Sequence, residues 1–505
     1  MFVRCIKNKN GKTYVQIVDK SSGKYKVLKN IGNSSDTEQV NQFMLIGKQY
    51  IENQIGLQQF DFSNEIVLYK QILSSIKTHK LAGIDLLLGK IFDEIGFNKI
   101  VDPIFKQLVL YRLVYPSSKL KTTEYLYRYQ QIYWDENKIY RYLDKLHSTQ
   151  KELVQQISYE HTVKILGNQP QVVFYDVTTI YFEIEREDEL RQTGFSKDGK
   201  HQKPQIVLGL LVSKNGYPLA YDIFDGKKFE GHTLIPIINS FKIKYKLQQL
   251  AVVADAGLLS NTNIQMLIEH KYEFILGARI KNENKLLQKQ ILATAYKNGT
   301  SKIFIKNDGT TLIVSYSDGR ARKDVLNRER GLKRLEKHIK QGKLTKNNIN
   351  NKGYNKYLKL DGTLNISIDY EKYKSDASWD GLKGYITNSQ LSKDEVIENY
   401  NQLWQIEKAF RVSKTDLKIR PIYHRLPKRI EAHICLNFVS YKIYKELERQ
   451  LKEKNATISV NKAIEIIQSI YEIEATTTKS KEIVKQILLL TDEQKYLATL
   501  FHFGC

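Results

Sequence analysis

Two short apolar runs of the chain each end in a single carboxylate. The run QVVFYDVTTIYF (171–182) carries Asp176 and predicts a strand buried on both faces. The run AVVADAG (251–257) repeats the arrangement with Asp255. A carboxylate within an apolar strand is costly unless it is hydrogen-bonded, paired or bound to a metal. Two such strands therefore suggest that both acids share a cation.

The segments between and after these runs predict a mixed α/β sheet. Apolar runs at 205–212, 218–226 and 272–280 predict further strands, and the patterns at 232–247 and 261–272 predict helices. Three strands in a meander, followed by alternating helix and strand, are typical of a mixed sheet flanked by helices.

The pattern divides the chain into six parts. They are an N-terminal β-hairpin (1–35), a helical basic region (36–165), a first core part (166–280), a β-rich insertion subdomain (281–390), a second core part (391–450) and a helical C-terminal tail (451–505). For the region 36–165 two interpretations remain open. It contacts DNA through a helix–turn–helix-like pair, or it is a helical bundle with a solvated basic face.

A third acid follows the insertion. The segment 392–418 opens with a capping box, Ser392 and Glu395, and predicts one helix. At about 100° per residue, its residues Tyr400, Leu403 and Glu407 share one face. We therefore expect Glu407 to point inward; the alternative is a solvated pair with Arg411.

The net charge of the chain favours a polyanionic partner. The 505 residues carry 79 Lys and Arg against 55 Asp and Glu, a formal charge of +24. Such an excess favours nucleic acid over a small neutral metabolite, although a merely basic soluble protein remains the alternative. Cys5, Cys435 and Cys505 form no CxxC motif, so neither a disulfide framework nor a zinc site is predicted. We expect a cytoplasmic protein without a membrane segment.

Two Asp and one Glu without His or Cys form a hard-oxygen ligand set, which suits Mg²⁺ or Mn²⁺. Two such ions can activate an attacking hydroxyl and stabilise the leaving oxygen of a phosphodiester. Lys414, which lies two turns beyond Glu407, is placed to contact a DNA phosphate.

Four segments resemble an insertion-sequence transposase of the DDE, RNase H-like kind, in the branch with a Tyr-x2-Arg-x3-Glu-x6-Lys signature. The segments are YDVTTIYFE around Asp176, residues 203–234, VVADAGLLSNTNI around Asp255, and YNQLWQIEKAFRVSK leading into RPIYHRLPKRIEAHICLNFVSY. Tyr400, Glu407 and Lys414 occupy signature positions. Leu403 replaces the signature Arg, which removes one expected DNA contact.

The resemblance implies an RNase H-like core in which Asp176, Asp255 and Glu407 are the catalytic ligands of two metal ions. It implies nicking at the transposon ends and attack of the freed 3′-hydroxyl on target DNA. The partners would be double-stranded terminal inverted repeats and target DNA, held by a homodimer. Arg411 would face DNA, and Trp379 is a candidate, by location in the insertion, for holding a flipped base; a partly buried structural aromatic is the alternative.

Two rival functions remain. A metal-dependent nuclease on the same fold would cut DNA without strand transfer, and only joined products distinguish it from a transposase. A non-catalytic DNA-binding protein derived from a transposase is the third hypothesis. The presence of all three acids favours the enzymes.

Overall fold

The computed structural model describes residues 1–55, 70, 73–196, 199–258, 261–345, 348–350, 353–361, 365–476 and 482–504. The chain divides into two compact units, Met1–Thr78 with Ile473–Lys485 and His79–Glu472 with Gln486–Cys505. In the part of the chain that is described, no helix is both long and apolar enough to cross a membrane.

The first unit begins with three antiparallel strands and a helix. The elements are β1 (Phe2–Lys7), β2 (Thr13–Asp19), β3 (Lys26–Ser34) and α1 (Thr37–Ile55). Gly11 and Gly23 adopt φ of +80° at the two turns, a backbone conformation that glycine adopts without strain. Val15 and Ile17 of β2 are fully buried, and α1 packs on β2 and β3. The expected hairpin is therefore part of a three-stranded sheet.

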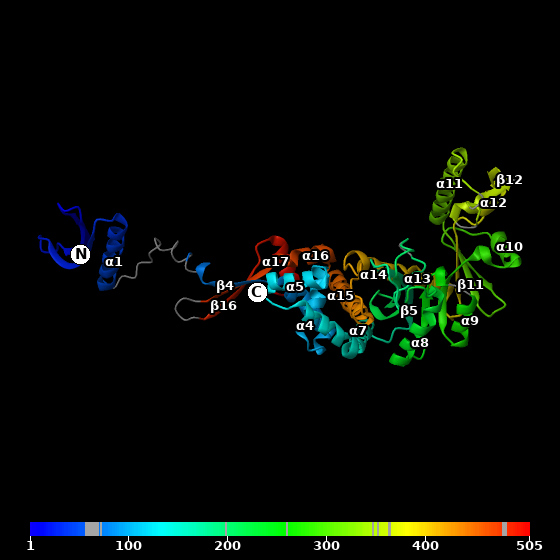
Figure 1. Cartoon of the computed structure of the whole chain (residues 1–505), viewed down its shortest axis with the longest axis horizontal. Coiled ribbons are helices and arrows are strands. Elements are labelled where there is room, and N and C mark those ends of the chain that lie inside the picture. The colour runs from blue at the N-terminus through cyan, green and yellow to red at the C-terminus, as the bar shows by residue number, and fades with distance from the viewer. Residues whose placement is uncertain are drawn as a thin grey trace. The chain divides into compact units, whose positions relative to one another are not determined.

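An eight-stranded sheet forms the centre of the second unit (Figure 1). Its order is β10-β11-β14-β9-β8-β5-β6-β7, and β5 runs parallel to β8, which runs parallel to β9. The strands are β5 (Val172–Tyr181), β6 (Gln205–Ser213), β7 (Pro218–Asp225), β8 (Ala251–Ala254), β9 (Glu273–Ala278), β10 (Ser301–Ile305), β11 (Thr311–Tyr316) and β14 (Leu382–Thr387). The structure thus contains the mixed α/β sheet that the sequence predicts.

Helices cover both faces of the sheet. Helices α8 (Leu234–Tyr245) and α9 (Asn261–Glu269) pack on the face that carries Val173 and Tyr175 of β5. Helices α13 (Lys393–Asn401), α14 (Trp404–Thr415) and α15 (Pro427–Glu453) share the opposite apolar core with Phe174 and Ile180. Alternate residues of β5 thus enter two cores, which explains its almost uninterrupted apolar pattern.

A helical bundle surrounds α15, which is buried without interruption from Ala432 to Leu447. The bundle helices are α3 (Lys90–Ile95), α4 (Pro103–Val114), α5 (Lys119–Gln130), α6 (Glu136–Lys145) and α7 (Lys151–Leu166). Helices α3, α4, α6 and α7 pack directly on α15. The helical part of the region 36–165 that follows residue 84 therefore shares one apolar core with the sheet.

The N- and C-terminal regions are not wholly helical. Strand β4 (Ile76–Leu81) interrupts the first region, and β15 (Tyr471–Thr476) and β16 (Ile483–Leu488) accompany helices α16 (Val460–Ile467) and α17 (Asp492–Phe501). The three strands form one sheet in the order β16-β15-β4. The hydrogen bonds of this sheet join strands that lie far apart in the sequence. Local hydrophobic periodicity does not encode such pairing, so the sequence pattern did not predict these strands. The stretches 56–69, 71–72 and 477–481 fall largely outside the described residues.

The insertion 281–390 is not a separate β-rich subdomain. Its strands β10, β11 and β14 extend the central sheet beyond β9, and the rest is mostly helical. The remaining elements are α10 (Lys285–Ala293), α11 (Asp318–Lys340), β12 (Leu358–Asp361), β13 (Asn365–Ile368) and α12 (Tyr370–Ala377). Pairing of β14 with β9 covers an otherwise open sheet edge, which accounts for the extension.

Candidate active site

Asp176 and Asp255 lie side by side on neighbouring strands. The parallel register pairs Tyr175 with Ala254, and the next residue in each chain segment is an acid. Adjacent strands are about 4.8 Å apart, and residues in register point to the same face. Both acids therefore occupy the face of Phe174 and Val253, where α13 and α14 also pack.

The two acids differ in exposure. Asp176 is half-buried within β5, and its Oδ1 accepts a 2.7 Å hydrogen bond from the backbone N–H of Val177. Asp255 follows the last residue of β8 and is exposed. The pair therefore has one anchored carboxylate and one that solvent or a ligand can reach.

Tyr400 connects α13 to this pair. Its hydroxyl donates a 3.0 Å hydrogen bond to Oδ1 of Asp255, while its ring is buried and packs edge-on against Tyr385 of β14. Burial raises the pKa of Tyr400, and the negative charges of Asp255 and Glu407 raise that pKa further. Both carboxylates are thus close enough to affect the same phenol.

A glycine on β9 makes the position of Tyr400 possible. A Cβ atom on Gly277 would lie 2.3 Å from the Tyr400 hydroxyl and 3.1 Å from the backbone nitrogen of Ala256. The first distance is too short for any side chain, so only glycine fits without movement of the phenol. Sequence reasoning missed Gly277, because nothing in YEFILGARI indicates which residue approaches from another helix.

Glu407 reaches the site differently from the sequence prediction. The predicted single helix is two helices, since α13 ends at Asn401 and α14 begins at Trp404. Glu407 lies in the first turn of α14 and is exposed, so the prediction that it points inward is wrong. Leu403 and Ile406 take the buried positions instead. Because α14 packs on β5, Glu407 still lies on the helix that covers the acid-bearing face.

Lys383 of β14 is a cation beside the carboxylates that sequence reasoning also missed. Its ammonium lies 4.5 Å from the ring centroid of Tyr400 and 5.3 Å from that of Tyr385. Burial lowers the pKa of Lys383, with a smaller contribution from Arg320, whereas Asp255 and Glu407 act in the opposite direction. The net downward direction means that burial outweighs the attraction of the two acids.

The three acids are the kind of ligand that a hard divalent cation prefers, but their carboxylates do not converge on one point in this structure. Asp176, Asp255 and Glu407 offer carboxylate oxygens, which Mg²⁺ and Mn²⁺ prefer. Among the described residues, however, no group of three or more His, Cys, Asp or Glu side chains is close enough to hold a metal ion. The structure thus brings Asp176 and Asp255 together, and Glu407 lies at the edge of the predicted site.

The other predicted residues lie around this centre. Arg411 is exposed on α14, and Lys414 is half-buried one turn later. Lys408, next to Glu407, forms an ion pair with Glu448 of α15. Leu403, at the signature Arg position, is 7% exposed and belongs to the apolar core.

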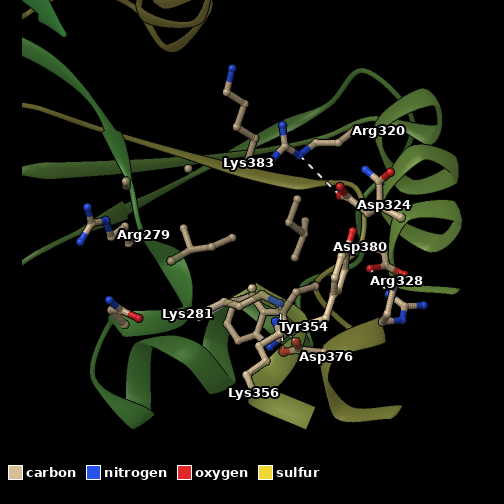
Figure 2. Close-up of a pocket in the computed structure, with 18 of the residues that line it drawn as sticks. Arg279, Lys281, Arg320, Asp324, Arg328, Tyr354, Lys356, Asp376, Asp380 and Lys383 are labelled. Atoms are coloured by element: carbon tan, nitrogen blue, oxygen red, sulfur yellow. Dashed lines mark hydrogen bonds and ion pairs between the residues drawn. The ribbon is translucent and has the colours of Figure 1, made fainter. Parts of the chain in front are cut away.

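Trp379 packs in a small apolar core of the insertion and is 9% exposed. It also lines a cavity of about 620 Å³ next to the acid-bearing face (Figure 2). Figure 2 shows Lys383 at one edge of this cavity, extending away from Asp376 and Lys356. Arg279, at another edge, donates a 3.1 Å hydrogen bond to the backbone carbonyl of Ala256, the residue after Asp255.

The cations of this cavity are largely paired with acids. Asp376 accepts hydrogen bonds from Lys281 at 3.0 Å and from Lys356, and Asp380 pairs with Arg328. Arg320 lies 3.6 Å from Asp324. The Arg328 pair joins α11 to the turn that precedes β14, and the Asp376 pairs join α12 to Lys281 and Lys356, so these ion pairs have a structural role.

Comparison with known proteins gives three findings. The family model described as "Transposase DDE domain" matches residues 167–443, which is more than half of the chain. No curated protein matches the chain. A cryo-EM structure of the piggyBac transposase synaptic complex with hairpin DNA is similar over 76% of this chain and 76% of that chain, with a TM-score of 0.37 and 10% sequence identity.

Proposed function

Since the chain belongs to the transposase DDE domain family, we propose that Asp176, Asp255 and Glu407 hold divalent cations while DNA is cut and joined at this site. DDE transposase domains depend on divalent metal ions. Such ions, when bound, activate the attacking hydroxyl and stabilise the leaving oxygen of a phosphodiester. The substrate would be the terminal inverted repeats of an insertion sequence together with target DNA.

The observation that carries the proposal is the strand register at Tyr175 and Ala254. It supports two adjacent carboxylates on one face of the sheet, at a place where Asp255 is open to solvent. Two ionised carboxylates about 5 Å apart repel each other, so an apolar core alone gives no structural reason for placing them on adjacent strands. A cation between them removes that repulsion.

The surrounding residues have distinct proposed roles. Tyr400 is a positioning residue that orients Asp255 through its hydrogen bond. Glu407 completes the ligand set by a change of side-chain rotamer, which its exposed position permits. Arg411 and Lys414 contact backbone phosphates, and Lys383 neutralises charge near Asp255 and Glu407.

Two copies of the chain would hold the two ends of an element, as the sequence analysis proposes for a homodimer. Mg²⁺ or Mn²⁺, two ions in each site, would suit the donor set. The +24 net charge supports the association of each copy with DNA.

The proposal is tested by measuring cleavage of supercoiled DNA that carries the flanking repeats of the element. We expect cuts at the repeat ends with Mg²⁺ or Mn²⁺ and none with EDTA. The variant Asp176→Asn should lose the cuts, because an amide does not replace a carboxylate as a metal ligand. Asp222→Asn is the matched control, since Asp222 is a half-buried acid on β7 of the same sheet. Equal cleavage by Asp176→Asn and wild type would disprove the assignment.

A further inference from the structure

A second cavity of about 510 Å³ lies between the bundle helices and the segment that follows α14. Its lining includes five basic side chains and neither Asp nor Glu. The basic residues are Arg112, Lys119, Lys121, Lys418 and Arg420. The cavity beside Trp379 differs in this respect, because Asp324, Asp376 and Asp380 line it and pair with its cations.

Two of these cations are buried without a counter-ion. Arg112 of α4 and Lys119 of α5 are each 6% exposed. Within the described residues, neither side chain makes a hydrogen bond or ion pair, and both line the cavity. Burying a charge without a partner costs roughly several kcal/mol. The retention of two such groups therefore indicates a role other than stabilising the apolar core.

Burial lowers the pKa values of the titratable groups around this cavity, and neighbouring positive charges add to the effect for three of them. Burial lowers the pKa of Arg112 to about 10, and burial together with the charge of Arg112 lowers the pKa of Lys119. The pKa of His424 is lowered to about 3 by burial first, and then by Lys119, Arg112 and Arg429. His433 is held neutral in the same way, and its Nε2 lies 3.0 Å from the carbonyl oxygen of Ile419.

The start of α5 adds backbone donors to this cavity. Ser118 caps the helix, and its Oγ accepts a 3.1 Å hydrogen bond from the N–H of Lys121. The N–H groups of Lys119 and Leu120 precede the first intrahelical hydrogen bond and are available to a ligand. A helix N-terminus carries about half a positive charge and is a common site for phosphate groups.

We propose that this cavity binds a phosphate group and that, in the working enzyme, a backbone phosphate of the DNA substrate occupies it. This inference rests on the proposed function for its choice of DNA. Arg112 and Lys119, together with the N-terminus of α5, are complementary to a phosphate, and neither Asp nor Glu lines the cavity; Lys121 is already paired with Glu124.

The cavity lies near the end of β5, the strand that carries Asp176. The Arg420 guanidinium lies 5.5 Å from the ring centroid of Tyr181, the last residue of β5. Tyr181 is five residues beyond Asp176, about 17 Å along a strand at about 3.3 Å per residue. Arg420 therefore lies beside the end of the strand that carries Asp176.

The test uses the full-length protein with Lys119→Met and with the double variant Arg112→Met, Lys119→Met. Binding of a fluorescent duplex carrying the terminal repeat is measured by anisotropy in EDTA at several salt concentrations. Loss of one phosphate contact reduces the slope of log K against log salt by about 0.9. We expect several-fold weaker binding for Lys119→Met and weaker binding still for the double variant, with a slope smaller by about 1 once the single phosphate contact is lost. Lys164→Met is the matched control, because Lys164 is exposed on α7.

Thermal unfolding distinguishes binding from a structural role. Removing an unpaired buried charge should leave the melting temperature unchanged or raise it, and Lys119→Arg should retain DNA binding. A large fall in melting temperature for Lys119→Met would show a structural partner for the ammonium and would overturn the proposal.

Inorganic phosphate separates the two sources of the ligand. If phosphate raises the melting temperature of the wild type but not of the double variant, while DNA binding is unchanged, the cavity binds free phosphate and not the DNA backbone. Wild-type behaviour of the double variant in both assays would overturn the proposal altogether. Since all binding is measured without metal, these results are independent of whether Asp176, Asp255 and Glu407 cut DNA.

Discussion

The Tyr400 hydroxyl donates a 3.0 Å hydrogen bond to the Asp255 carboxylate, joining α13 to the end of β8 across 145 residues of sequence. Asp255 is otherwise at the exposed end of a short strand, so this bond fixes the direction of its carboxylate. Partners of metal ligands of this kind orient the ligand and adjust its basicity.

Tyr400→Phe removes this hydrogen bond and keeps the ring. We expect metal-dependent cleavage to fall by roughly 10- to 100-fold, the usual effect of losing such a partner, with DNA binding in EDTA unchanged. Initial cleavage rates at several Mn²⁺ concentrations measure the effect. Tyr385→Phe is the control, because the Tyr385 ring packs against Tyr400 while its hydroxyl accepts a 3.4 Å hydrogen bond from Ser315. Equal rates for the two variants would show that the bond has no part in catalysis.

Gly277→Ala should act through the same hydrogen bond. The added methyl would lie 2.3 Å from the Tyr400 hydroxyl, so the phenol must move away from Asp255. We expect a loss of stability of about 1–3 kcal/mol, typical of overpacking, and a cleavage defect similar to that of Tyr400→Phe. The double variant should cleave no more slowly than the slower single variant, since both changes break one interaction. Defects that multiply would contradict this coupling.

Lys383→Met should stabilise the metal-free protein at neutral pH. Burial lowers the pKa of Lys383, so below that pKa the folded state carries a charge that the unfolded state solvates better. Between the lowered pKa and the ordinary value of about 10.4, the unfolded chain binds more protons, and wild-type stability rises with pH. The gain from Lys383→Met should therefore shrink as pH rises toward 10. Urea unfolding from pH 7 to 10 measures it, and a gain that grows with pH would refute the argument.

Substitutions of Trp379 distinguish a role in the apolar core of the insertion from a role in DNA binding. Trp379→Ala should destabilise the insertion core by about 3–5 kcal/mol, because it empties the space between Ile280, Leu312 and Leu382. Trp379→Phe should lose much less stability. Hydrogen exchange of β11 and β14 reports the local loss. If Trp379 also holds a base, Trp379→Phe should weaken end binding, and unchanged end binding would leave Trp379 a structural residue.

The sequence predicts correctly that Asp176 and Asp255 lie on neighbouring strands, because the local signal of both strands is strong. An apolar run that ends in Asp predicts both the strand and the exceptional position of Asp176 and Asp255. The direction of Glu407 could not be predicted, since a break at Gln402 and Leu403 rotates α14 relative to α13 and local periodicity assumes one straight helix. Pairing of β14 with β9 depends on contacts across about 110 residues, which no local pattern encodes.

The buried cations show a different limit. Arg112 occupies an otherwise apolar helix, and Lys119 follows two serines, so the sequence suggests snorkelling or exposure for both. Their burial becomes visible only when α4, α5 and the segment 418–424 are brought together. A basic side chain without an acid partner has no signature in a single sequence.

The most direct test of the central claim compares wild type with Glu407→Gln in one reaction on supercoiled DNA carrying both terminal repeats. Glu398→Gln serves as the control, because Glu398 is an exposed acid on the adjacent helix α13. The account predicts metal-dependent cuts at the repeat ends and products joined to target DNA for wild type and the control, with neither for Glu407→Gln. Cuts without joined products would indicate a nuclease. End binding without cuts by all three proteins, or full activity of Glu407→Gln, would contradict the assignment of Asp176, Asp255 and Glu407 as the catalytic acids.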